Sequence, residues 1–176
     1  QGTVTIDGRD VTALSPEERG VGYVPQSTAL FHHLTVDENI RYSRFNGRGS
    51  DDVAETVITM MNLRPYLAKK PRELSGGFRA RVALARALFS EPSVMLLDEP
   101  MTEVDHAKKE QVLPEFRTVL RELKVPVLYI THDPREAQLV GERFCVMDKG
   151  KIRMIDSTEE AFEAIRTIAL RNADCL

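Results

Sequence analysis

The stretch LSGGFRARVALARALFSEPSVMLLDEP (residues 74–100) decides the fold predicted for this chain. It opens with a Ser-Gly-Gly turn, continues as a basic, alanine-rich helical segment, and closes with an apolar run that ends in Asp98 and Glu99. A helix N-terminus opened by glycines suits an anion, because its first amides have no partners inside the helix and the helix dipole attracts negative charge. A buried strand that ends in two carboxylates suits a metal ion. The stretch therefore predicts a site for a nucleotide phosphate and a divalent cation.

The composition is that of an ordinary soluble globular protein. The chain has 176 residues, 42% hydrophobic and 29% charged, which is enough to bury a sizeable core. Its formal net charge of −3 gives no reason to expect a nucleic-acid partner. No apolar run approaches the roughly 20 residues that span a bilayer, so any membrane role is expected to be peripheral. The cysteines, Cys145 and Cys175, lack the spacing of a metal site and fit a reducing compartment.

Apolar runs and helical patterns alternate on both sides of the opening stretch. The run 94–97 is continuous, which predicts a strand buried on both faces. Strands that alternate with helices through right-handed crossovers imply an α/β domain with a mostly parallel sheet. The expected strands are 3–6, 21–24, 94–97, 125–130, 144–148 and 151–156, and the expected later helices are 76–89, 105–123, 134–142 and 158–170.

Residues 36–70 interrupt this alternation with helical patterns alone. Thr35–Glu38 resembles a capping box that opens a helix toward Phe45. Ser50 caps a second helix, in which apolar residues recur at helical spacing. We therefore expect a helical subdomain inserted in the fold. It divides the chain into 1–35 (the start of the core), 36–73 (the helical subdomain) and 74–176 (the rest of the core).

Polar side chains follow the ends of two expected strands. Asp98 can hold Mg²⁺ directly or through water, and Glu99 can polarise an attacking water. Pro100 ends their strand sharply, which favours a functional role for both acids over that of two surface carboxylates. His132 follows the apolar run 127–130, where open α/β sheets place ligands. Taken alone, this histidine and the Ser-Gly-Gly turn each fit a structural role as well.

The order and spacing of these motifs resemble those of the ATP-binding-cassette (ABC) family. The resemblance covers nearly the whole chain and implies an α/β, P-loop NTPase-like fold, ATPase activity, and ATP and Mg²⁺ as ligands. The matching stretches are Leu74–Gly77, Val82–Leu88, Met95–Pro100 and Ile130–Asp133, with Val24-Pro25-Gln26 in the position of the glutamine loop and Asp105 in that of the D-loop aspartate.

The resemblance implies a role for each matching polar residue at the chain's own nucleotide. Asp98 would support Mg²⁺, and Glu99 would be the catalytic carboxylate. His132 would contact the γ-phosphate and position the water. Gln26 would join the metal site and sense a transmembrane partner.

Other matching residues imply that two cassettes act as a pair. Ser75, Gly76 and Gly77 would bind ATP held mainly by the opposing subunit, so hydrolysis would require a head-to-tail dimer. Asp105 would lie at that dimer interface. The helical segment would carry much of the contact with a transmembrane permease subunit, which places the expected protein in the cytoplasm, peripherally on the inner face of the cell membrane.

The chain departs from the family pattern at several positions. Phe78 stands where the family signature usually ends in glutamine, which removes a polar side chain. The D-loop usually reads serine-alanine-leucine-aspartate, whereas Thr102–Asp105 places Glu103 at an interface expected to be tight. No G-x-x-x-x-G-K-[ST] phosphate loop (Walker A) occurs in the sequence. We therefore expect a fragment of a longer cassette, incomplete at its N-terminus, that does not hydrolyse ATP at a useful rate alone.

Local features favour an importer among the proteins that share these motifs. His132–Ala137 and the segment 30–36 resemble importers of molybdate, sulfate and related small solutes, and Asn39–Tyr42 leans toward their oxyanion members. A ribosome-associated translation factor with paired cassettes is an alternative, because an aromatic residue at the position of Phe78 also occurs there. A non-catalytic regulatory cassette, in which the missing phosphate loop is natural, is a further alternative.

Overall fold

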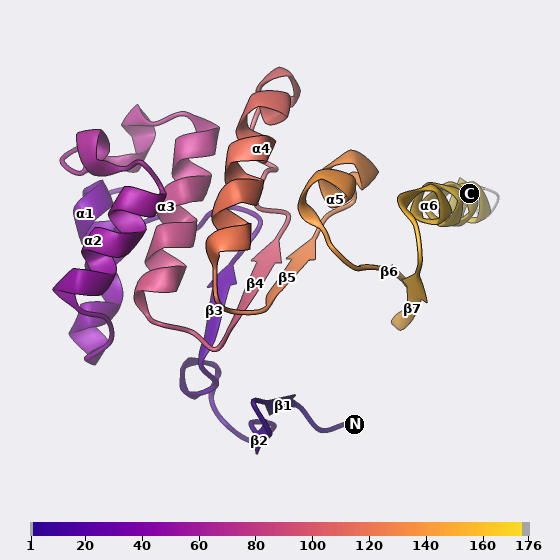
Figure 1. Ribbon diagram of the computed structural model, residues 1–176, viewed down its shortest axis with the longest axis horizontal. Helices are drawn as coiled ribbons and strands as arrows, with labels where there is room; N and C mark the ends of the chain where they lie inside the picture. Colours follow the sequence, from indigo (N-terminus) through magenta and orange to yellow (C-terminus); the bar gives the residue numbers. More distant parts are fainter. Residues whose placement is uncertain (1, 174–176) are drawn as a thin grey trace. The chain divides into compact units, whose positions relative to one another are not determined.

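The computed structural model describes residues 2–173 and divides the chain into two compact units (Figure 1). The first unit ends at Ile130, and the second begins at Thr131. Among the described residues, no helix is both long enough and apolar enough to cross a membrane.

A three-stranded parallel sheet forms the centre of the first unit. Its strands are β3 (Val21–Val24), β4 (Val94–Asp98) and β5 (Val127–Ile130), in the order β3-β4-β5. All the pairings are parallel, as the alternation of strands and helices predicts. Parallel pairing brings the carboxyl ends of these strands to one edge of the sheet, where Gln26 and Glu99 follow β3 and β4.

Strand β4 is fully buried on one face only, so the expectation of burial on both faces is wrong. Met95 and Leu97 are completely buried on one face of the strand, whereas Leu96 on the other face is half-buried. In the neighbouring strands, Tyr23 and Leu128 lie in register with Leu96 and are about half exposed. In this unit, a continuous apolar run therefore does not show whether a strand is buried on both faces of the sheet or on one face only.

Helices α3 (Gly76–Phe89) and α4 (His106–Glu122) accompany the sheet. Helix α3 packs on β3 and on α4, and its residues Val82, Ala83, Leu84 and Ala85 are almost completely buried. This run of buried small and branched side chains explains why an alanine-rich sequence forms the central helix. Helix α4 continues through Pro114.

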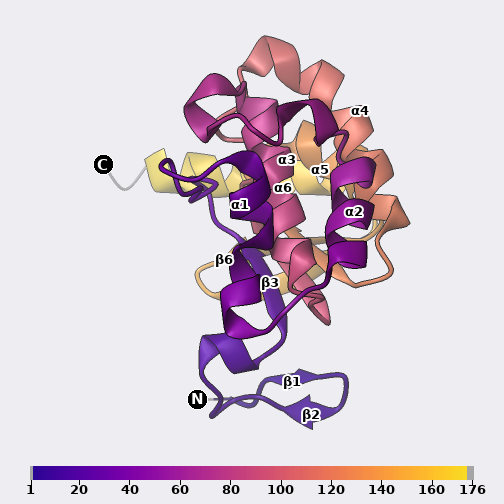
Figure 2. The same ribbon diagram turned by 90° about the vertical axis from the view of Figure 1, so that its left-hand side faces the viewer.

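The helical character predicted between the strands is confirmed. This region contains α1 (Val36–Ile40), α2 (Asp51–Met60) and the 3₁₀ turns 41–46, 64–66 and 71–73. The predicted capping box is present, because the Glu38 amide donates to Thr35 Oγ1 at 3.2 Å and the Thr35 amide donates to Glu38 Oε2 at 2.7 Å. The helix expected to reach Phe45 tightens to 3₁₀ geometry from residue 41. Figure 2 shows α1 and α2 beside α3, with which both make contact.

The side chain of Asn39 in α1 connects this helix to the loop before it by hydrogen bonds. This side chain is completely buried and makes hydrogen bonds to both backbone groups of Phe31, at 2.9 and 3.0 Å. The same amide donates to the carbonyl of Thr35 at 2.9 Å. These bonds satisfy backbone groups in a segment without regular secondary structure and attach it to α1.

The N-terminal part of the first unit is a short hairpin followed by a turn of helix. Strands β1 (Thr5–Ile6) and β2 (Arg9–Asp10) pair in antiparallel fashion around the predicted Asp7-Gly8 turn. Both turn residues have positive φ, 50° and 76°, which is the geometry that an Asp-Gly pair favours. A 3₁₀ turn at 16–18 follows, as the Ser15-Pro16 signature predicts.

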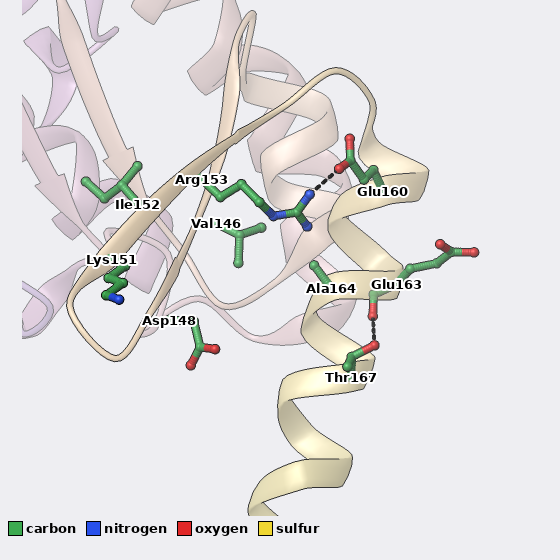
Figure 3. Close-up of a pocket in the computed structure, with 9 residues that line it drawn as sticks. All are labelled: Val146, Asp148, Lys151, Ile152, Arg153, Glu160, Glu163, Ala164 and Thr167. Atoms are coloured by element: carbon green, nitrogen blue, oxygen red, sulfur yellow. Dashed lines mark hydrogen bonds and ion pairs between the residues drawn. The ribbon is translucent and has the colours of Figure 1, made fainter.

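The second unit contains α5 (Pro134–Val140), the antiparallel hairpin β6 (Phe144–Asp148) and β7 (Lys151–Ile155), and α6 (Thr158–Ala173). A pocket of about 670 Å³ lies between the hairpin and α6 (Figure 3). Arg153 of β7 pairs across it with Glu160 of α6, and the Thr167 hydroxyl donates to the Glu163 carbonyl at 2.8 Å. The Arg153–Glu160 pair joins the hairpin to the helix within this unit, whereas the Thr167 bond lies inside α6.

Candidate functional site

A cluster of polar side chains lies at the carboxyl edge of the parallel sheet. Gln26 follows β3, and Glu99 follows β4, the adjacent strand. Gln26 Nε2 donates to Glu99 Oε2 at 2.9 Å. Two residues 73 positions apart, each predicted from its motif, are therefore in direct contact. We call Tyr23, Gln26, Asp98 and Glu99 the strand-end cluster.

Glu99 is held by its backbone as well as by its side chain. Its amide donates to the Ile130 carbonyl at 2.9 Å, which extends the β4–β5 pairing by one residue. The Thr102 hydroxyl lies 3.2 Å from Glu99 Oε2 and donates to the Glu99 carbonyl at 2.9 Å. Glu99 adopts a φ of 47°, in the left-handed region that costs a non-glycine residue about 1–2 kcal/mol. A strained residue fixed from several sides is typical of a functional position.

Asp98 has a partner that the sequence motifs did not indicate. The Tyr23 hydroxyl donates to Asp98 Oδ2 at 3.2 Å. Partial burial of the hydroxyl raises the pKa of Tyr23, and the hydrogen bond and negative charge of Asp98 raise it further. Tyr23 therefore remains a neutral hydrogen-bond donor near pH 7, and it fixes one oxygen of the carboxylate.

The donor set of the strand-end cluster fits Mg²⁺. Carboxylate oxygens of Asp98 and the amide oxygen of Gln26 are the hard ligands that Mg²⁺ prefers. Within the described residues, no group of three or more His, Cys, Asp and Glu side chains gathers in a way that could hold a metal.

The Ser75-Gly76-Gly77 turn opens α3, as predicted. Ser75 is the N-cap residue, and its hydroxyl faces the Phe78 amide at 3.5 Å. A Cβ atom on Gly76 would lie well under 3.0 Å from the Glu103 carbonyl oxygen. Cβ atoms in real structures essentially never come so close to another heavy atom. A Cβ atom on Gly77 would lie 3.1 Å from a methyl group of Val112. Gly76 is therefore required by packing, independently of any role in binding phosphate.

Asp105 lies beside this turn in the structure, at the start of α4. It precedes His106 as the N-cap residue, but its carboxylate makes no capping hydrogen bond. The carboxylate is instead mostly exposed and lies 3.2 Å from Lys108 Nζ. The adjacent Val104 contacts the turn, since its Cα would be 3.3 Å from a Cβ on Gly76. The residues predicted to act on a partner's nucleotide thus lie close together, while Gln26, Asp98 and Glu99 form the other group.

His132 belongs to the second unit, and its predicted role stays a prediction. The loop around it is ordered by neighbouring side chains. The Thr131 hydroxyl donates to the buried Glu136 carboxylate at 3.0 Å and accepts from the Asp133 amide at 3.0 Å. Asp133 in turn caps α5 by accepting from the Arg135 amide at 2.9 Å.

Sequence reasoning missed the partners of two site residues. The sequence predicts Tyr23 only as part of the strand 21–24, although its position in β3 brings its hydroxyl to Asp98. The motifs gave Arg79 of α3 no role, whereas its Nε donates to Glu103 Oε2 at 2.8 Å. Glu103 itself was a usable signal, because an acid at a position expected to be packed tightly calls for a nearby cation.

Comparison with known proteins gives a consistent result. The sequence model of the ABC transporter family matches residues 1–102. A molybdate/tungstate import ATP-binding protein of Archaeoglobus fulgidus is 42% identical over 166 residues, covering 93% of this chain and 69% of that protein. An sn-glycerol-3-phosphate import ATP-binding protein of Yersinia enterocolitica is 37% identical over 171 residues, or 95% of this chain and 47% of its own length.

A further curated relative and a solved structure extend the similarity. A sulfate/thiosulfate import ATP-binding protein of Mycobacterium bovis is 37% identical over 167 residues, covering 93% of this chain and 48% of the relative. The chain therefore spans 69% of the first relative and about half of the other two. The dimeric structure of the ATP-binding cassette MJ0796, in a post-hydrolysis state with ADP and Pi, matches with a TM-score of 0.69 and 29% identity. That match covers 89% of this chain and 75% of the solved one.

Proposed function

Because the chain belongs to the ABC transporter family and has the fold of its ATPases, we propose that it acts in an ATP-hydrolysing subunit that powers solute import. The observation that carries this proposal is the hydrogen bond between Gln26 and Glu99 at the carboxyl edge of the sheet. It joins the residues that follow two adjacent parallel strands, which is where open α/β sheets bind ligands. The proposal also divides the chain into three parts: the start of the ATPase core (1–35), the helical subdomain (36–73) and the rest of the core (74–176).

Glu99 is proposed to accept a proton from the attacking water. The hydrogen bond from Gln26 holds its carboxylate in one orientation, so the base does not have to reorganise during the reaction. Asp98 and Gln26 would hold Mg²⁺, which when bound would offset the negative charge of the phosphates. Tyr23 keeps the Asp98 carboxylate in place for that purpose. His132 would position the water next to the γ-phosphate.

The second group of residues is proposed to act across a dimer. Ser75, Gly76 and Gly77 would present the N-terminal amides of α3 to ATP held mainly by the opposing subunit. Asp105 would lie at the same interface. The proposal is supported by the matching cassette of known structure, which is dimeric and contains ADP and Pi. A head-to-tail arrangement of two cassettes would then complete each site.

An aromatic surface supports contact with a transmembrane permease subunit. The ring of Tyr42 lies 4.2 Å from that of Phe31 and 5.8 Å from that of Phe45, between centroids. Phe45 is 85% exposed, which is costly for an aromatic side chain unless another surface covers it. The guanidinium of Arg86 lies over the Phe31 ring, 5.2 Å from its centroid, in a cation–π contact. Such contact would hold the protein at the inner, cytoplasmic face of the cell membrane.

The transported solute is proposed to be a small oxyanion. The relatives described above are named as importers of molybdate or tungstate, of sn-glycerol-3-phosphate, and of sulfate or thiosulfate. All of these solutes carry negatively charged oxygen atoms. The Asn39–Tyr42 segment leans in the same direction in the sequence.

The test of this function is the substitution Glu99→Gln in the full-length protein. The amide retains the size of the side chain but cannot accept the water's proton, so nucleotide binding should persist while turnover falls by about 10²-fold or more. Binding is measured by equilibrium titration with ATP and Mg²⁺, and turnover by phosphate release. Glu122→Gln, an exposed position at the end of α4, serves as the matched control and should behave as wild type. Unchanged turnover in Glu99→Gln would refute the role of this carboxylate.

A further inference from the structure

Glu103 occupies a junction between three segments of the first unit. It lies in the 99–105 turn, which is closed by backbone hydrogen bonds from Thr102 to Glu99 at 3.0 Å and from Val104 to Met101 at 3.0 Å. Its carboxylate accepts from Arg79 Nε at 2.8 Å through Oε2 and from the Thr28 hydroxyl at 3.3 Å through Oε1. The charge expected at a dimer interface is therefore paired with a cation within the same chain.

Each partner of Glu103 is itself fixed to another part of the unit. Arg79 Nη1 donates to the Leu74 carbonyl at 2.9 Å, so this arginine bridges the 99–105 turn and the residue that precedes the Ser75–Gly77 turn. Thr28 is 3% exposed, and its carbonyl accepts from Arg86 Nη2 at 3.1 Å. Glu103 thus connects the start of α3 with the segment that follows Gln26.

The backbone of Glu103 also makes a close contact, with Gly76 at the start of α3. Its carbonyl group occupies the space that any side chain on Gly76 would need. The Arg79 and Glu103 side chains retain 27% and 29% of their exposure, so the pair is partly shielded from solvent. A charged hydrogen bond in such surroundings is stronger than one at an open surface, and loss of one partner leaves the other charge without compensation.

We propose that Glu103 is a positioning residue that clamps the 99–105 turn to the start of α3 and to the segment after Gln26. The clamp makes Glu99, at one end of the turn, and the Ser75–Gly77 turn move as one piece. The consequence for activity rests on the proposed function, because it matters only where Glu99 and Ser75–Gly77 serve ATP. That Glu103 holds these segments together is inferred from its contacts alone; we call this the mechanical part of the inference.

Hydrogen exchange in the full-length protein tests the mechanical part. Glu103→Ala should raise the exchange rate of the amides in the 99–105 turn by about tenfold or more, because a hydrogen bond to a charged group is lost. In the 99–105 turn, the double variant with Arg79→Ala should exchange no faster than Glu103→Ala alone, since the Arg79–Glu103 pair is the contact of Arg79 with this turn and its other bond goes to the Leu74 carbonyl.

The matched control is Glu115→Ala. Glu115 lies on α4, outside the 99–105 turn, and forms an ion pair with Arg81. Arg81 lies on α3, two residues after Arg79. Its loss should leave exchange in the 99–105 turn unchanged. Unchanged exchange in Glu103→Ala, additive effects in the double variant, or equal effects in Glu115→Ala would each overturn the proposal. If Glu103→Ala fails to fold, Glu103→Gln, which keeps the size and loses the charge, is measured by the same criteria.

The functional part is tested by ATP hydrolysis under the same conditions. Glu103→Ala should lower kcat per folded molecule by about tenfold or more while the affinity for ATP stays within about twofold of wild type. A role in stability alone would lower the folded fraction and leave kcat per folded molecule unchanged, which would overturn the proposal. Absence of ATP hydrolysis in the wild-type protein would count against the proposed function, whereas the exchange experiment would still decide whether the clamp exists.

Discussion

Replacement of Gly76 by alanine tests the packing at the start of α3. A Cβ atom at this position would lie 2.9 Å from the Glu103 carbonyl carbon and 3.3 Å from Val104 Cα, and closer still to the Glu103 carbonyl oxygen. All of these atoms belong to the backbone of the 99–105 turn, which cannot turn aside as a side-chain tip can. The turn must therefore shift, and its hydrogen bonds and its ion pair to Arg79 must shift with it.

The expected loss of stability follows from two opposing effects. Overpacking of a well-filled site typically costs about 1–3 kcal/mol. Alanine is favoured over glycine in a helix by up to about 1 kcal/mol, and less than that in the first turn. The net loss should be about 1–2 kcal/mol, which lowers the midpoint of thermal unfolding by about 2–8 °C in a domain of this size.

The measurement is chemical and thermal unfolding followed by circular dichroism, with Gly77→Ala as the matched control. A Cβ on Gly77 would meet only the Val112 side chain, at 3.1 Å, so a small rotation of that side chain relieves the contact. Gly77→Ala should therefore lie within about 0.5 kcal/mol of wild type. The reasoning fails if Gly76→Ala is as stable as wild type, or if Gly77→Ala is the more damaging of the two.

Two further predictions concern the helical region. Asn39→Leu should cost about 1–3 kcal/mol in chemical unfolding, because it leaves the Phe31 amide without its hydrogen bond, whereas the Phe31 and Thr35 carbonyls keep the bonds from the Leu34 and Asn39 amides; a loss below about 0.5 kcal/mol would contradict this account. Hydrogen bonds from the backbone and hydroxyl of Thr35 lower the pKa of Glu38 from its ordinary value of 4.5, so Glu38 stabilises the fold above that value and loses this contribution as the pH falls through its lower folded pKa. Glu38→Gln should therefore flatten the acid limb of a plot of unfolding midpoint against pH, and an unchanged slope there would refute the assignment.

The sequence alone predicted the elements whose signals are local. The capping box at Thr35, the helix 76–89 and the strand that ends at Asp98 depend on residues close together in the chain, and all are present. The approach of Gln26 to Glu99 could be predicted as well, because parallel strands end at one edge of a sheet. Motif spacing and this geometric rule were sufficient for the core of the candidate site.

The remaining contacts depend on registers and turns that no local pattern specifies. The bond from Tyr23 to Asp98 requires the pairing of Tyr23 with Leu96 in β3 and β4, which is set by the packing of the whole sheet. The pair Arg79–Glu103 requires a turn that returns the chain to α3 after 24 residues. The one-sided burial of β4 likewise cannot be predicted from its sequence, because residues 94–97 are apolar on both faces of the strand.

The left-handed backbone of Glu99 has a consequence for protein engineering. Glycine and asparagine adopt a φ of 47° more readily than glutamate, so either residue at this position should relieve about 1 kcal/mol of strain. A selection for thermostability alone would therefore favour the removal of the very carboxylate on which turnover is proposed to depend. Any library built on this chain should hold position 99 fixed, or should screen each stabilised variant for hydrolysis.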